Sequence, residues 1–182
     1  MNRNPLHCIL PPDILYRFAS SDDAATRAAA LATLELDHLF RLTRAESAAR
    51  AGGRQTQPIT FARIGGQPQR TIYDQHNATA QTPGTVARSE RQPPVPDQAV
   101  NQAYDGLGDT YTFYWSIFQR DSIDGQGLPL LGLAHYGSNY DNAFWDNAGH
   151  MFFGDGDGRL LTQTTAGIDV IGHELTHGVT QH

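Results

Sequence analysis

The sequence predicts an α+β fold in which a helical N-terminal segment precedes a region of mixed strands and helices. An alanine-rich run over residues 22–50 has the composition of a long helix. Positions three and four residues apart form its amphipathic stripe, namely Leu31, Leu34, His38 and Leu42. Short β-prone runs bounded by polar or turn residues follow at 71–73, 130–136 and 151–153. A last helix is expected from about residue 165 or 168 to the end of the chain.

The N-terminal segment contains two boundary signals. Pro11-Pro12 excludes a helix before it, so the first residues are expected to be extended. Ser20 followed by Asp23 resembles a capping box with Asp in place of Glu, and it predicts where the long helix begins. Residues 48–55 lose the helical pattern and are interpreted as an exposed linker.

A second helix is predicted over residues 97–120. Asp97 is a suitable N-cap, and apolar and aromatic residues recur after it at helical spacing. Gly106 and Gly108 weaken the middle by about 1 kcal/mol each relative to alanine. The run 154–158, with Asp155 and Asp157, is interpreted as a tight turn rather than a calcium loop, since no Glu follows at the required spacing. His135 and His150 are interpreted as ordinary strand and loop residues.

Composition excludes several functions. The chain has 182 residues, 39% of them hydrophobic, and all 13 of its cationic residues are arginine. Without lysine there is no Schiff-base lysine, phosphate-loop lysine or lysine general base. The net charge of -6 argues against a nucleic acid as the main partner. Cys8 is the only cysteine, so no intrachain disulfide is possible, and no run reaches the roughly 20 apolar residues of a membrane span.

Acidic residues are concentrated late in the chain. Residues 97–182 contain eleven acidic residues and two arginines, whereas residues 51–96 contain five arginines and two acidic residues. This distribution predicts either packing of the acidic part against the basic part or a cation site in the acidic part.

The predicted last helix carries the motif His173-Glu174-Leu175-Thr176-His177, an HExxH sequence. Residues four apart share a helix face, so both imidazoles can reach one ion, and neutral imidazole is a good zinc ligand. Glu174 is placed to act on a water molecule beside that ion rather than to bind the ion. The motif therefore predicts a zinc hydrolase site.

Longer stretches carry a family resemblance. Residues 167–180, Gly-Ile-Asp-Val-Ile-Gly-His-Glu-Leu-Thr-His-Gly-Val-Thr, closely resemble thermolysin-like zinc endopeptidases, peptidase family M4. The runs 140–145 and 154–158 and the helical region 97–125 resemble the same family, so the similarity covers about residues 60–182. Pro11-Pro12 followed by Ile14-Leu15 resembles the short precursor of the protealysin-like branch.

The resemblance implies a role for each matching residue. His173 and His177 would bind zinc, and Glu174 would be the general base. Asn142 and the backbone of Ala143 would form a cleft edge that binds the substrate backbone by strand addition, and Trp145 would help to shape the cleft. Asp169 matches an acidic residue of a calcium site in the family. Its alternative interpretation is an acid favoured by the N-terminal end of a helix dipole.

Cys8 lies beside Pro11-Pro12 in the predicted precursor. One hypothesis is that its thiolate occupies the open zinc position and keeps the enzyme latent. The alternative is that Cys8 is a small buried apolar residue. Both interpretations remain open from the sequence.

The resemblance also implies a domain organisation. Residues 1–52 would be the precursor segment and linker, acting as an intramolecular inhibitor or chaperone, and residues 53–182 would be the β-rich N-terminal catalytic lobe. The family's third zinc ligand, a Glu on a later helix, has no counterpart before His182. We therefore expect the C-terminal helical lobe to be absent from this chain. We also expect the isolated chain to bind zinc weakly and to show little proteolysis.

The predicted function is that of a zinc metalloendopeptidase precursor that hydrolyses internal bonds of protein or peptide substrates. The alternative is a non-catalytic fragment that acts as a binding or inhibitory partner of a related protease. The first residues do not resemble a signal peptide, which favours an intracellular location or export without a leader. The family implied by the resemblance is mostly secreted.

Overall fold

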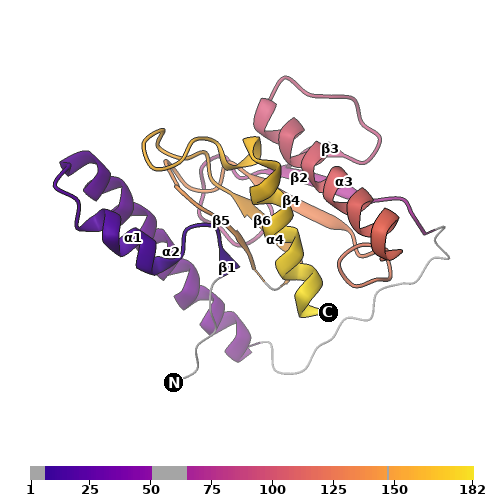
Figure 1. Cartoon of the computed structure of the whole chain (residues 1–182), viewed down its shortest axis with the longest axis horizontal. Helices are drawn as coiled ribbons and strands as arrows, with labels where there is room; N and C mark the ends of the chain where they lie inside the picture. The colour runs from indigo at the N-terminus through magenta and orange to yellow at the C-terminus, as the bar shows by residue number, and fades with distance from the viewer. Residues whose placement is uncertain (1–6, 51–64, 147) are drawn as a thin grey trace.

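The computed structural model describes residues 7–50, 65–146 and 148–182. The predicted linker after residue 50 and the boundary at 52/53 lie outside the described residues. Two helices, α1 (Pro12–Ala19) and α2 (Ala24–Arg50), form a hairpin at one end of the molecule, and a mixed sheet with helices α3 and α4 forms the rest (Figure 1).

The sheet has six strands in the spatial order β1-β5-β6-β4-β2-β3. In chain order they are β1 (His7–Cys8), β2 (Arg70–Asp74), β3 (Thr85–Ser89), β4 (Leu130–Ala134), β5 (Ala143–Trp145) and β6 (His150–Phe153). The central pairs β2–β4 and β4–β6 are parallel, and the outer pairs are antiparallel. The N-terminal segment therefore supplies the edge strand of a sheet that is otherwise built from residues 70–153.

Both faces of the sheet are covered. Helices α3 (Gln98–Phe118) and α4 (Ile168–Gln181) pack on one face, and α2 packs on the other. Because side chains alternate along a strand, Ala143 and Trp145 of β5 point into the core beneath α3 and α4, whereas Phe144 points into the core beneath α2. A short 3₁₀ turn, η1 (Thr164–Ala166), leads into α4.

The predicted helix over 97–120 is confirmed. The carboxylate of Asp97 accepts a hydrogen bond from the Val100 N–H at 3.2 Å, as an N-cap should. Gly106 sits where α4 crosses, and a Cβ atom there would lie only 2.4 Å from Ile171. The glycine that weakens α3 locally thus permits close packing of the two helices.

The predicted stripe on α2 is wrong. Leu31 and Leu42 have exposed fractions of 53% and 50%. The buried positions instead precede the stripe by one or two residues, namely Ala30, Thr33, Asp37 and Phe40. Polar partners in the loop before β5 select the face of α2 that docks, as well as the apolar area that it buries. Hydrophobic periodicity does not detect such polar contacts.

The predicted capping box is also wrong in its first residue. The carboxylate of Asp23 caps α2 by accepting a hydrogen bond from the Thr26 N–H at 2.8 Å. The Ser20 hydroxyl instead donates to the Tyr16 carbonyl of α1. The four residues 20–23 connect the two helices, so the cap of α2 is Asp23 rather than Ser20.

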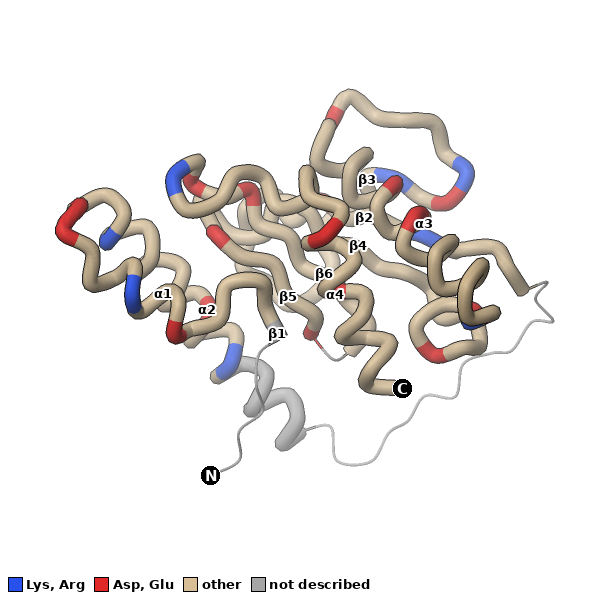
Figure 2. The backbone as a smooth tube through the Cα atoms, in the orientation of Figure 1, with Lys and Arg blue, Asp and Glu red and all other residues tan. Residues whose placement is uncertain are grey.

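The acidic residues between positions 97 and 182 lie on several separate loops and helices (Figure 2). Within the described residues, no group of three or more His, Cys, Asp or Glu side chains is arranged to hold a metal ion. The uneven charge distribution therefore does not correspond to a complete cation site there.

No helix in the described parts of the chain combines the length and the apolar character that a bilayer span requires.

Candidate active site

The HExxH motif lies in the middle of α4, with its two histidines one turn apart. The Nε2 atoms of His173 and His177 are 2.7 Å apart, and the ring planes are at 84° with centroids 4.4 Å apart. Two nitrogens on a tetrahedral zinc ion at 2.0–2.1 Å would lie about 3.3 Å apart. A small rotation of either ring therefore lets both nitrogens bind one ion.

Glu174 lies on the adjacent, buried side of α4. Its side chain is fully buried, and neither carboxylate oxygen has a hydrogen-bond partner of ordinary geometry. Burial raises the pKa of Glu174 to about 8, opposed only by the nearby backbone N–H of Trp145. Burying a carboxyl group without a hydrogen-bond partner costs free energy, so such a group indicates a place where a ligand or water molecule binds.

The two histidines fit a zinc ion as two of its ligands. A catalytic zinc site has three protein ligands and an open position for water or substrate. Residues 7–50, 65–146 and 148–182 supply two of these ligands at this place. A complete site requires a third from outside those residues.

Trp145 lies beneath α4 rather than at the surface. Its indole N–H donates to the side-chain oxygen of Gln181 at 2.7 Å. A Cβ atom at Gly178 would lie 3.2 Å from the indole ring, so helix and ring are in close contact. Trp145 joins β5 to α4, and it can shape a cleft only through the position of α4.

Asn142 and Ala143 are occupied by the N-terminal segment. β1 pairs antiparallel with β5, and the Ile9 N–H donates to the Ala143 carbonyl at 3.2 Å. The Asn142 side chain clamps Leu10, accepting from its N–H at 2.9 Å and donating to its carbonyl at 3.0 Å. An extended peptide thus lies on the edge that the sequence analysis assigns to substrate.

Cys8 belongs to β1, and its side chain is buried in the apolar cluster beneath α2, together with Phe40 and Phe144. It is 7% exposed, and its thiol donates to the Leu10 carbonyl at 3.3 Å. Burial, followed by the charge of Asp37, raises the pKa of the Cys8 thiol to about 12, and the charge of Glu174 contributes to the same shift. The thiol therefore lies within electrostatic reach of Glu174 and is protonated in the metal-free protein.

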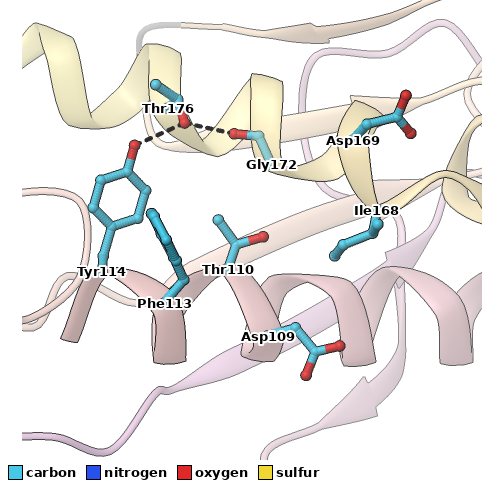
Figure 3. Close-up of a pocket in the computed structure, with 8 residues that line it drawn as sticks. All are labelled: Asp109, Thr110, Phe113, Tyr114, Ile168, Asp169, Gly172 and Thr176. Carbon is cyan, nitrogen blue, oxygen red and sulfur yellow. Dashed lines mark hydrogen bonds between the residues drawn. The ribbon is translucent and has the colours of Figure 1, made fainter. Parts of the chain in front are cut away.

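Asp169 lies in the first turn of α4, where the helix dipole favours a carboxylate. It borders a groove of about 380 Å³ between α3 and α4. The residues lining this groove are Asp109, Thr110, Phe113, Tyr114, Ile168, Asp169, Gly172 and Thr176 (Figure 3). The Asp169 carboxylate is turned away from the groove in this view, so a calcium role for it remains a proposal.

The sequence model of a family described as thermolysin metallopeptidase, catalytic domain, matches residues 53–181. The chain belongs to the thermolysin metallopeptidase family. An extracellular metalloprotease of Pectobacterium carotovorum is 41% identical over all of this chain and 49% of its own length. A bacillolysin of Bacillus cereus is 45% identical over 60% of this chain and 19% of its own length.

Among solved structures, the precursor of protealysin, a metalloproteinase from Serratia proteamaculans, is similar to this chain. It has a TM-score of 0.75 and 41% identity, over 96% of this chain and 46% of that chain. The predicted α+β fold is thereby confirmed. The present chain spans about half the length of the relatives that it matches along its whole length.

The polar contacts between α2 and the loop before β5 are not predicted by the sequence. Thr33 accepts a hydrogen bond from the Asp141 N–H at 3.3 Å, and the Tyr140 hydroxyl donates to the buried carboxylate of Asp37. Burial raises the pKa of Asp37 to about 6. Two polar residues at positions 33 and 37 on an apolar helix are the only signal that could have indicated these contacts.

His135 was also missed as a structural residue. Its two ring nitrogens lie 2.8 Å from carboxylate oxygens of Asp97 and Asp155. The hydrogen bond to Asp155 is the largest cause that raises the pKa of His135, to about 9. The imidazolium, which follows β4, joins the start of α3 to the turn after β6. These three segments are distant in the chain, so no local pattern predicts the contact.

Proposed function

We propose that this chain is the N-terminal part of a zinc endopeptidase precursor. The observation that carries the proposal is the convergence of the His173 and His177 Nε2 atoms on the face of α4 next to an unpaired, buried Glu174. A zinc ion held there would polarise a scissile carbonyl and acidify a water molecule. The third protein ligand would come from the part of the relatives that this chain does not span.

Glu174 would act as the general base in this mechanism. Its carboxylate accepts a proton from the attacking water and delivers it to the leaving amine. The position of Glu174 suits both steps, since its buried carboxyl group has no hydrogen-bond partner of ordinary geometry among the described residues and lies next to the place where the two histidines would hold the ion. No covalent intermediate with the chain is required.

Substrate would bind as an additional strand on β5. The carbonyl of Ala143 and the side-chain amide of Asn142 already bond an extended peptide, that of β1. The same groups would bond the backbone of a protein or peptide substrate once β1 leaves. Substrate and β1 therefore compete for one edge.

We propose that residues 1–52 act as an intramolecular inhibitor. Support comes from three contacts with the lobe: β1 on β5, the Asn142 clamp on Leu10, and the polar contacts of α2 with Tyr140 and Asp141. Cys8 would contribute to latency as a zinc ligand after deprotonation by the metal, which requires its side chain to leave the apolar cluster beneath α2. Asp169 would hold calcium only together with ligands outside the described residues.

Zinc titration tests the proposal on the chain itself. Competition with a chromophoric chelator should give one zinc per chain, lost in His173→Ala and kept in Glu174→Gln. Joined to the C-terminal half of the Pectobacterium relative, the chain should cleave casein once residues 1–52 are released, and Glu174→Gln should abolish that cleavage. Zinc binding that survives His173→Ala overturns the assignment. Tight binding to an active relative without any cleavage would favour the non-catalytic inhibitory fragment instead.

A further inference from the structure

A hydrogen-bond chain connects α3 to the helix that carries the two histidines. The hydroxyl oxygens of Tyr114 and Thr176 are 2.8 Å apart, and the Thr176 hydroxyl donates to the Gly172 carbonyl at 2.7 Å (Figure 3). A threonine hydroxyl has a single proton, and here it is given to Gly172. Tyr114 is therefore the donor to Thr176.

The two α4 residues in this chain occupy defined places in the motif. Gly172 directly precedes His173, and Thr176 directly precedes His177. Each imidazole is thus one residue away from a group that is tied to Tyr114. A rotation of α4 about its axis would stretch the bond from Tyr114 and redirect both rings together.

The contacts around this bond include apolar ones, which fix the distance between α3 and α4 more than their rotation. Ile171 and Leu175 are each 1% exposed and pack into the core, and Ile171 lies against Gly106. Apolar contacts are non-directional, whereas a hydrogen bond fixes a donor and an acceptor in line. The Tyr114 hydroxyl therefore gives α4 a directional contact beside the two histidines, in addition to the 3.4 Å bond from Arg120, just after α3, to the Val179 carbonyl near the end of α4.

We propose that Tyr114 is a positioning residue for the two histidine ligands. It acts through Thr176 to hold the rotation of α4 at which both Nε2 atoms point to one place. The inference rests on the proposed zinc site and adds a residue outside the HExxH motif to it. Partners that orient metal ligands typically contribute 10–100-fold to metal affinity.

The zinc affinity of the 182-residue chain tests this role. Tyr114→Phe keeps the ring and removes only the hydroxyl, and we expect about tenfold weaker zinc binding. Thr176→Val should weaken binding to a similar degree, and the double variant should be no weaker than either single variant. Thr176→Ser restores the hydroxyl and should bind within about twofold of the wild type.

Thr180 provides the matched control. Its hydroxyl donates to the His177 carbonyl at 3.0 Å on the exposed side of the same helix. Thr180→Val removes a similar bond within α4 and should leave zinc affinity unchanged. Equal effects of Tyr114→Phe and Thr180→Val, or a lower melting temperature in Tyr114→Phe with unchanged zinc affinity, would overturn the proposal.

A metal-free readout separates this inference from the zinc assignment. The imidazole nitrogen NMR shifts of His173 and His177 should change in Tyr114→Phe and not in Thr180→Val. If the wild type binds zinc no better than His173→Ala, the proposed function fails. Tyr114 is then judged on the NMR shifts alone, and unchanged shifts reject it.

Discussion

The Tyr140 hydroxyl donates a hydrogen bond to the buried carboxylate of Asp37, and this bond joins α2 to the loop that precedes β5. Asp37 is 2% exposed and belongs to the N-terminal segment, whereas Tyr140 belongs to the lobe. Burial of an ionisable group at such a contact makes the contact depend on pH.

Docking of α2 should weaken as the pH rises through about 6. Burial raises the pKa of Asp37 from its usual 3.8 to about 6, so the folded state binds the proton more tightly. The stabilisation is complete below pH 4 and is lost as the pH rises through the folded value, on the order of 3 kcal/mol in all. Urea unfolding between pH 4 and 7.5 should show this loss in the wild type and not in Asp37→Asn.

Glu35 is the control for that experiment, since it is an exposed acid on the same helix. Glu35→Gln should follow the pH profile of the wild type. Parallel profiles for the wild type and Asp37→Asn would contradict the assignment of the pH dependence to Asp37.

Asn142→Ala should release β1 from the edge of the sheet. The substitution removes both bonds between the Asn142 amide and the Leu10 backbone. Leaving these groups unpaired costs about 1–3 kcal/mol, so the amide protons of Ile9 and Leu10 should exchange roughly tenfold faster or more. Hydrogen exchange followed by NMR measures these protons individually.

Asn101 offers a matched control for Asn142. Its side-chain amide clamps the Val95 backbone in the same way, accepting at 3.0 Å and donating at 2.7 Å. Asn101→Ala should destabilise its own loop and leave the exchange of Ile9 and Leu10 as in the wild type. Equal acceleration in both variants would mean that Asn142 affects overall stability rather than β1.

The Cys8 thiol should report the release of β1. It is the only cysteine, it is buried, and burial raises its pKa to about 12, so native protein should react slowly with a thiol-specific disulfide reagent. Asn142→Ala should react at least tenfold faster, since release of β1 exposes the thiol. Fast reaction of the wild type, at the rate of a free thiol, would show that β1 is not docked.

His135 should stabilise the lobe up to alkaline pH. The pKa is raised to about 9, mainly by the hydrogen bond to Asp155 and also by that to Asp97, so the stabilisation is complete below about 6.5 and is lost as the pH rises through 9. His135→Gln should lower the melting temperature at pH 7, and the difference from the wild type should shrink by pH 10.

His76 serves as the comparison for His135, because its side chain is 64% exposed beside Asp74. His76→Gln should barely change the melting temperature at either pH. A constant difference between wild type and His135→Gln from pH 7 to 10 would exclude the charged bridge as the source of stability.

Sequence reasoning succeeded where the signal is local. The placement of His173, Glu174 and His177 on one helix follows from a spacing of four, and the Asp97 cap follows from the residue type at a helix start. It failed to predict which face of α2 is buried, because the partners of Thr33 and Asp37 lie more than 100 residues away in the chain.

The residues around the site that the sequence did not reveal also have partners that are distant in the chain. Tyr114 and Thr176 are 62 residues apart, and each fits its helix pattern without any partner. The bonds of Asn142 to Leu10 span 132 residues. Only the folded structure brings such pairs together, so neither periodicity nor motif spacing can predict them.

X-ray absorption at the zinc edge tests the central claim most directly. With one equivalent of zinc, the chain should show two imidazole scatterers at about 2.0–2.1 Å, and one of them should be lost in His177→Ala. An added sulfur scatterer near 2.3 Å, absent in Cys8→Ser, would identify Cys8 as a ligand in the latent form. A spectrum that is identical in wild type, His173→Ala and His177→Ala would contradict the account.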